Sequence, residues 1–161
     1  MNTWSLLIAS LFLLPLSTFA YSGTPVRDLS PLSYQVTQNG GTEKPYENLY
    51  WDTHTAGIYV DIITGAPLFS SRDKYDSGTG WPTFARPINK YVLRYKADFS
   101  GSEERNEVIA RKSWSHLGHL FDDGPVEYNW VRYCMNSAAL RFVPLADMKK
   151  EGYGIYMRFV R

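Results

Sequence analysis

The sequence predicts a mainly β domain in which two antiparallel sheets form a β-barrel-like core, with short N-terminal helical segments. Short runs rich in β-branched and aromatic residues recur at even spacing, separated by glycine-, proline- and aspartate-containing turns. Aromatic residues make up 16% of the chain, which suits a β-rich core with an apolar binding surface. A length of 161 residues bounds the fold to one ordinary domain with a substantial core.

Residues 1–20 form an uncharged, apolar segment ahead of this domain. The run is broken by Pro15, is too short for a comfortable membrane span, and ends in Thr-Phe-Ala, close to the small-x-small cleavage rule. We predict a secretory signal peptide cleaved after Ala20, an exported (periplasmic or secreted) protein, and a domain over residues 21–161. Because no Lys or Arg precedes the apolar run, an uncleaved N-terminal membrane anchor is the alternative.

Helix and strand signals then follow in order. Ser30 as N-cap and Pro31 in the first turn predict a helix that ends near Gln38, before Asn-Gly-Gly. Residues 41–52 are expected to be irregular, and the polar residues 98–106 to separate two strands. Strands are predicted for residues 57–63, 92–96, 107–112, 130–136 and 153–161, with a short helix within 144–151.

Charge and cysteine content exclude several classes of protein. Seventeen basic and sixteen acidic residues give a formal charge of +1, so no global field favours nucleic acid or an anionic membrane. One cysteine forms neither an intramolecular disulfide nor a four-cysteine zinc site. We expect a monomer.

The only cysteine lies in the strand predicted for residues 130–136. Alternation places Arg132, Cys134 and Asn136 on one face, so the thiol has a guanidinium and a carboxamide beside it. A nearby cation favours the thiolate. The alternative is that Arg132 points to solvent and Cys134 is a small core residue. The opposite face carries Val131, Tyr133 and Met135.

Two of the three histidines, His116 and His119, lie shortly before this strand. The turn at residues 122–125 would fold the chain back and bring an imidazole beside the thiol. Histidine moves protons near neutral pH, although a single histidine is more often a hydrogen-bonded structural residue. Two of them on the same excursion as the sole cysteine favour catalysis.

The blocks HLGH, DDGP and RYCMNSAALRF, within residues 116–142, resemble the C-terminal signature of methionine sulfoxide reductase B. The resemblance continues upstream in residues 41–52 and 57–88 and covers the chain from about Leu29 to about Pro144. It implies a peptide-methionine (R)-S-oxide reductase with a β-barrel-like core. Such an enzyme reduces the R epimer of methionine sulfoxide, in proteins or as the free amino acid, and would repair oxidative damage in exported proteins.

The resemblance also implies a role for each site residue. Cys134 would be the nucleophile that attacks the sulfoxide sulfur and becomes a sulfenic acid. His119 would donate a proton to the sulfoxide oxygen, and His116 would act through water. Arg132 would stabilise the thiolate. The residues implied to order the histidines and waters are Asn136 and Asp123.

Trp81 lies in a loop, residues 76–84, that contains two glycines and a proline. On composition alone, a residue of the packed core is the favoured interpretation of Trp81. The matching tryptophan of the family lines the pocket for the substrate's S-methyl group, an apolar and sulfur–aromatic contact. The resemblance therefore implies that Trp81 binds substrate.

The chain departs from many relatives at two sets of positions. Asp61, Thr64, Ala110 and Ser113 stand where those relatives carry two pairs of zinc-binding cysteines, so no zinc and no other metal cofactor is expected. Thr79 stands where many carry a resolving cysteine. The sulfenic acid would therefore be reduced by an external thiol, from a thioredoxin-like or glutaredoxin-like protein or a small molecule.

Two other functions remain open from the sequence. One is a non-catalytic module that holds a methyl-bearing ligand against Trp81. The other is a zinc or copper site made of His116, His119 and Cys134, which would occupy the thiol.

Overall fold

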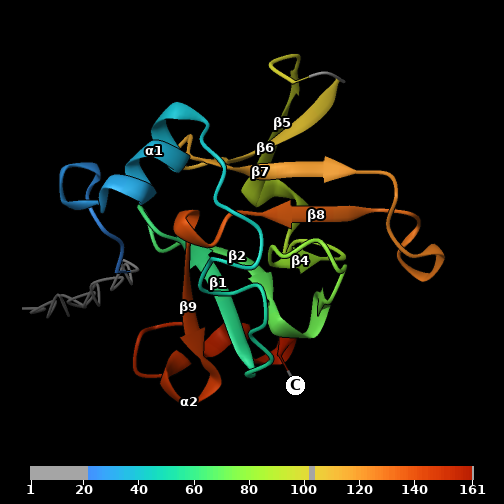
Figure 1. The fold of residues 1–161 in the computed structure, drawn as a ribbon. Coiled ribbons are helices and arrows are strands. Elements are labelled where there is room, and N and C mark those ends of the chain that lie inside the picture. Colours follow the sequence, from blue (N-terminus) through green and yellow to red (C-terminus); the bar gives the residue numbers. More distant parts are fainter. Residues whose placement is uncertain (1–21, 102–103, 161) are drawn as a thin grey trace, which may run out of the picture.

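A computed structural model of the chain describes residues 22–101 and 104–160 (Figure 1), so the expected signal peptide lies outside the described residues. The strands are β1 Gly57–Asp61, β2 Pro67–Ser70, β3 Lys74–Tyr75, β4 Thr83–Phe84, β5 Leu93–Asp98, β6 Arg105–Ala110, β7 His116–Phe121, β8 Arg132–Met135 and β9 Leu140–Pro144. The α-helices are α1 Pro31–Asn39 and α2 Leu145–Met148. Short 3₁₀ segments are η1 Val26–Asp28, η2 Ser71–Asp73, η3 Lys90–Val92, η4 Val126–Tyr128, η5 Ser137–Ala139 and η6 Gly154–Phe159.

The strands form two sheets, and every pairing in them is antiparallel. The smaller sheet has the order β2-β1-β9, and the larger has the order β3-β4-β8-β7-β6-β5. This confirms the predicted mainly β fold with two antiparallel sheets. Within the described ranges the sheets stay open and do not close into one barrel.

Helix α1 begins and ends close to the predicted positions. The Ser30 hydroxyl accepts a hydrogen bond from the Ser33 amide at 3.0 Å, which caps the helix. Gly40 ends the helix in the left-handed region, at φ 68°, where glycine has no steric cost. In the described part of the chain, no helix is long and apolar enough to cross a membrane.

Two apolar clusters hold the sheets together, and β1 contributes to both because its side chains alternate. Tyr59 packs into the main cluster, edge-on to Phe84 at 5.0 Å between ring centroids. Ile58 and Val60 pack into a second cluster beneath α2. Both faces of β1 are therefore buried, which explains its three consecutive apolar residues, Ile58, Tyr59 and Val60.

The strand predicted over residues 153–161 is wrong, because the structure has η6 there. Tyr153 is fully buried in the second cluster, and its hydroxyl donates to the Gly65 carbonyl at 2.8 Å. Tyr156, Met157 and Val160 pack against the same cluster. The spacing of these residues is helical rather than alternating, so one side of the helical segment packs on the second cluster.

The strand that carries the cysteine begins later than predicted. Asn129 and Trp130 lie in the left-handed region, at φ 55° and 60°, and so cannot extend β8. From Arg132 onward the alternation holds. Tyr133 and Met135 belong to the main cluster, while Arg132 and Asn136 are buried polar residues.

Candidate active site

Cys134 lies at the centre of the larger sheet. Its Cα partners are Thr83 on β4 and His119 on β7. The excursion at residues 122–131 joins β7 to β8 and folds them into antiparallel neighbours, as the turn signals predict. The His119 residue on β7 is therefore directly opposite Cys134 on β8, the residue that carries the only thiol.

A small cavity of about 120 Å³ opens over Cys134. It brings together four of the predicted site residues, namely Cys134, His119, Trp81 and Asn136. The other residues that line it are Thr42, Arg105, Gly118, Phe121 and Met135. Of the predicted set, His116, Arg132 and Asp123 lie outside its lining.

Burial dominates the electrostatics of the thiol. It raises the pKa of Cys134, and the charge of Arg132 together with hydrogen bonding from Thr79 and Arg132 offsets the rise only in part. The electropositive setting expected from the sequence is therefore outweighed by desolvation. At neutral pH the resting cysteine is a thiol, so its proton must be removed before it attacks.

Arg132 is fixed by a bidentate ion pair with Asp123. The Asp123 oxygens accept from Nε at 2.6 Å and from Nη2 at 2.9 Å, and the guanidinium lies over the Phe121 ring at 4.2 Å. The hydrogen bond to Arg132 holds the pKa of Asp123 below its usual range. Asp123 thus orients Arg132 through both of its carboxylate oxygens.

His119 is held by Asp98, at the end of β5. The ring Nε2 and the Asp98 Oδ2 are 2.7 Å apart, and Arg105 binds the same oxygen at 2.8 Å. Hydrogen bonds from Ser100 and then from His119 hold the pKa of Asp98 well below its usual range, so this carboxylate only accepts. Nε2 therefore carries the hydrogen, and Nδ1 is left with a free lone pair. Burial lowers the pKa of His119 despite the Asp98 hydrogen bond, so the ring is neutral at pH 7.

His116 forms a second histidine–carboxylate pair, with Glu107 on β6. Its Nδ1 lies 2.8 Å from the Glu107 Oε1, and its ring centroid lies 5.3 Å from that of His119. The His116 ring is buried, and its Nε2 has no hydrogen-bond partner among the residues that the structure describes. The two histidines thus form a buried pair, each anchored from the β5–β6 hairpin.

Asn136 anchors the irregular segment 41–52 against the site. Its Oδ1 accepts from the Glu43 amide at 2.9 Å, and its Nδ2 donates to the Leu117 carbonyl at 3.2 Å. The Trp81 indole donates to the Glu43 carbonyl at 3.1 Å, which fixes this wall of the cavity. Asn136 therefore orders the chain around the pocket through backbone groups.

Sequence reasoning missed four residues of this arrangement, namely Asp98, Arg105, Glu107 and Glu43. The first three lie at or near the polar stretch that was expected only to separate two strands. The sequence contains part of the evidence, because Arg105 and Glu107 are two positions apart and so point to the same face of a strand. That strand comes shortly before the two histidines. The β6–β7 pairing places Glu107 opposite His119, and from there the Glu107 side chain reaches His116.

Asp61 and Thr64, at the first pair of positions where many relatives carry zinc-binding cysteines, lie in a turn that is held by hydrogen bonds to the Asp61 side chain. The Asp61 carboxylate accepts from the amides of Ile63 and Thr64, at 3.3 and 3.2 Å, and from the Thr64 hydroxyl. Over residues 22–101 and 104–160, no three His, Cys, Asp or Glu side chains gather as a metal site would require. The alternative site of His116, His119 and Cys134 therefore gains no support from the geometry.

Gly118 lets β7 approach the backbone that carries the thiol. A Cβ at this position would lie 2.1 Å from the Cys134 carbonyl oxygen, and φ is +154°. We expect Gly118→Ala to lower the free energy of unfolding by more than about 2 kcal/mol, because backbone rather than a flexible side chain must move. Gly154→Ala is the matched control, since its Cβ would meet nothing closer than 3.9 Å. Chemical denaturation measures both, and equal losses would contradict the close approach.

A binding module has no need of a thiol paired across strands with a carboxylate-held imidazole. The site instead defines an enzyme of the thiol oxidoreductase class. A family model described as the SelR domain matches residues 29–144, most of the chain. The chain therefore belongs to the SelR family, the type B methionine sulfoxide reductases, and is a peptide-methionine (R)-S-oxide reductase. Enzymes of this family act on methionine sulfoxide and draw on thiol reductants.

Proposed function

We propose that the protein reduces methionine-R-sulfoxide through a sulfenic acid on Cys134, and that an external thiol then restores the enzyme. The observation that carries the proposal is that Cys134, His119 and the Trp81 indole line one small cavity. The sulfoxide's methyl group would lie against the indole, with its sulfur toward the thiol and its oxygen toward the imidazole.

The first step is a proton transfer within the enzyme. Neutral His119 takes the thiol proton at Nδ1, because Asp98 holds the hydrogen on Nε2. The thiolate sulfur then attacks the sulfoxide sulfur, and the imidazolium gives its proton to the sulfoxide oxygen. The Asp98 carboxylate stabilises the imidazolium during this exchange.

The electrons balance between the two sulfur atoms. The sulfoxide sulfur gains two electrons and leaves as the thioether of methionine. The attack forms a sulfur–sulfur bond, and transfer of the protonated oxygen to the cysteine sulfur breaks both that bond and the sulfoxide sulfur–oxygen bond. The cysteine sulfur thereby loses two electrons and holds the oxygen as a sulfenic acid. An external thiol then displaces this oxygen as water, and a second thiol releases Cys134 from the mixed disulfide.

Two features support an external reductant. The chain has one cysteine, and Thr79 hydrogen-bonds to it from the position where many relatives carry a resolving cysteine. A threonine hydroxyl cannot form a disulfide with the sulfenic acid. Thioredoxin-like, glutaredoxin-like and small-molecule thiols are the classes of donor proposed.

The proposed activity is tested with purified protein, dithiothreitol and each epimer of N-acetyl-methionine sulfoxide methylamide. We expect repeated turnover of the R epimer, none of the S epimer, and no more than one turnover when the thiol is withheld. Equal reduction of both epimers, or sustained turnover without a thiol, would be evidence against this chemistry.

Arg132 is proposed to favour the thiolate during attack. We expect Arg132→Met to raise the pKa of Cys134 further, because the arginine charge lowers it, so alkylation by iodoacetamide becomes slower at every pH below the new pKa. The variant can stay folded because the Asp123 side chain, its lost partner, is 61% exposed and can be hydrated. Lys90→Met, distant in sequence and on the exposed η3, is the control. An unchanged or lower midpoint in the pH dependence of alkylation would refute this role.

We also propose that the protein works outside the cytoplasm and repairs oxidised exported proteins. The uncharged apolar composition and small-residue end of residues 1–20 support export. A lone thiol also has no internal partner that an oxidising compartment could trap as a disulfide. N-terminal sequencing of the protein recovered from the periplasm or medium should begin at Tyr21, and an intact Met1 in the membrane fraction would indicate an anchor instead.

A further inference from the structure

We propose that a groove beside the catalytic cavity binds the polypeptide that flanks an oxidised methionine, and that it favours a basic residue there. The inference rests on the proposed function and deepens it, because it specifies where the chain beside the oxidised methionine binds and which flanking residue is preferred. It is carried by the two residues that the groove shares with the catalytic cavity, by a strained aromatic residue and by local charge.

The groove has a volume of about 470 Å³ and shares two residues, Arg105 and Phe121, with the lining of the catalytic cavity. The cavity itself, at about 120 Å³, has room for little more than one side chain. Free methionine sulfoxide would leave the neighbouring groove empty. A chain that inserts one side chain into the cavity would continue past Phe121 into the groove.

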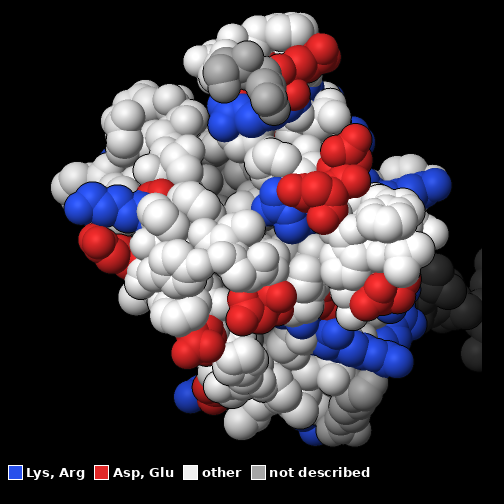
Figure 2. Space-filling view, turned by 45° about the vertical axis from the view of Figure 1, so that its right-hand side comes forward, with Lys and Arg blue, Asp and Glu red and all other residues white. Residues whose placement is uncertain are grey.

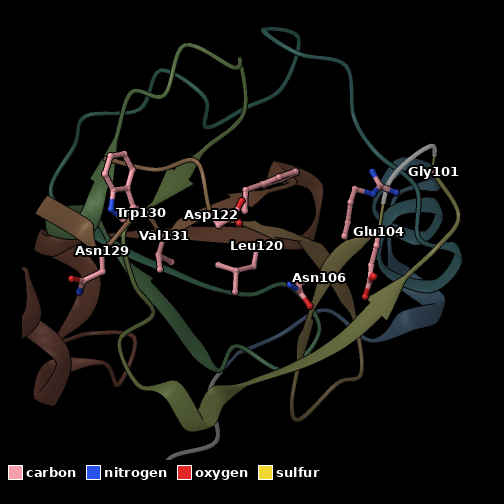
Figure 3. A pocket seen from close by; sticks show the side chains of 10 residues that line it. Gly101, Glu104, Asn106, Leu120, Asp122, Asn129, Trp130 and Val131 are labelled. Carbon is pink, nitrogen blue, oxygen red and sulfur yellow. The ribbon is translucent and has the colours of Figure 1, made fainter. Parts of the chain in front are cut away.

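The floor and one end of the groove are apolar. Figure 3 shows Trp130 at one end, with Val131 and Leu120 along the floor toward Asn106 and Glu104. Trp130 is 58% exposed, which leaves a large indole surface open beside the groove. Aromatic side chains that are rigid and exposed at a hollow are strong anchors for a bound chain.

The backbone of Trp130 is strained in a way that keeps the indole in place. Its φ of 60° is unfavourable for a bulky residue, and Asn129 before it is also left-handed. Hydrogen bonds hold this conformation, since the Trp130 amide donates to Pro125 at 3.1 Å and its carbonyl accepts from Gly124 at 2.9 Å. A turn built for connection alone would place asparagine or glycine here.

The charge within the groove is acidic. Glu104 and Asp122 line it, and Arg105, the one cation among the described residues of the lining, is already paired with Asp98 at 2.8 Å. The face shown in Figure 2 carries acidic and basic side chains interspersed, so the acidic bias belongs to the groove rather than to the whole face. Carboxylates on the rim favour Lys or Arg in the bound chain.

The test compares three R-sulfoxide substrates by their kcat/KM values with dithiothreitol as reductant. One is the single residue N-acetyl-methionine-R-sulfoxide methylamide, and two are heptapeptides that differ only in Lys or Glu beside the sulfoxide. We expect the Lys peptide to be the best substrate. Trp130→Asn, which keeps a residue that tolerates the left-handed turn, should lower kcat/KM for the Lys peptide by about tenfold or more and leave the single residue unchanged.

Trp114→Asn is the matched control, because Trp114 is also exposed (64%) and left-handed (φ 63°) but precedes β7 instead of following it. It should leave all three values unchanged. Asp122→Asn should reduce the preference for Lys over Glu severalfold.

Each failure has its own meaning. If the parent does not reduce the single-residue substrate, the proposed function itself is wrong. If the parent reduces it but Trp130→Asn affects the peptide and the single residue alike, or neither, the groove inference is overturned. Equal use of the Lys and Glu peptides by the parent would overturn its charge preference.

Discussion

Replacing Cys134 with serine is expected to abolish reduction of methionine-R-sulfoxide, with a loss of more than about 10³-fold in kcat. A serine hydroxyl is not ionised by a neutral imidazole as a thiol is, and its oxygen cannot take up the sulfoxide oxygen as a sulfenic acid. The measurement is thiol-dependent turnover of the R epimer. Because serine is nearly isosteric, the variant should fold, and its unfolding transition should lie close to that of the parent.

The substitution also separates the enzyme from a binding module built on the same fold. A module that held methionine sulfoxide against Trp81 would bind equally well with serine beneath it. Retained turnover in the serine variant would therefore remove Cys134 from the mechanism. Retained binding without turnover is the expected outcome.

The second large effect is expected at His119. His119→Gln should lower kcat by roughly 10²- to 10⁴-fold, because both the acceptor of the thiol proton and the donor to the sulfoxide oxygen are lost. His54→Gln is the matched control, since this third histidine is exposed and forms a hydrogen bond with Asp52, away from the site. A loss at His54 equal to that at His119 would show that the effect is not specific to the site.

Asp98→Asn tests whether Asp98 controls the pKa and the tautomer of His119. The Asp98 hydrogen bond raises the pKa of His119 against the larger lowering by burial, so its removal should lower that pKa further. Activity needs neutral His119 in the free enzyme and is lost as pH falls through its pKa, so the acidic limb of kcat/KM should move to lower pH. We also expect kcat to fall by more than about tenfold, because asparagine no longer holds the hydrogen on Nε2. A fall in kcat with an unmoved acidic limb would indicate a merely structural role for Asp98.

Local signals predicted much of the fold. Ser30, Pro31 and Gly40 bound α1 by capping chemistry that depends on the chain immediately around them. Alternation from Arg132 onward separated the polar residues of β8 from Tyr133 and Met135 in the core. The strand prediction for residues 153–161 was wrong because it assumed that buried and exposed residues alternate there. Tyr153, Tyr156 and Val160, which pack on the core, recur instead at helical spacing.

The parts of the site that sequence reasoning missed depend on contacts between strands. Asp98 meets His119 across 21 positions in the chain, and only the registers of β5, β6 and β7 together place them side by side. The pKa of Cys134 could not be predicted from its neighbours in sequence, because burial outweighs the arginine beside it. Register and burial are properties of the folded chain rather than of any short segment.

The central claim is that methionine-R-sulfoxide oxidises the Cys134 thiol to a sulfenic acid. The direct measurement is mass spectrometry of the reduced, thiol-free protein after one equivalent of methionine-R-sulfoxide, with dimedone added to trap a sulfenic acid. We predict stoichiometric release of methionine and one dimedone adduct, located at Cys134. Release of methionine with Cys134 unmodified and still alkylated by iodoacetamide would contradict the account.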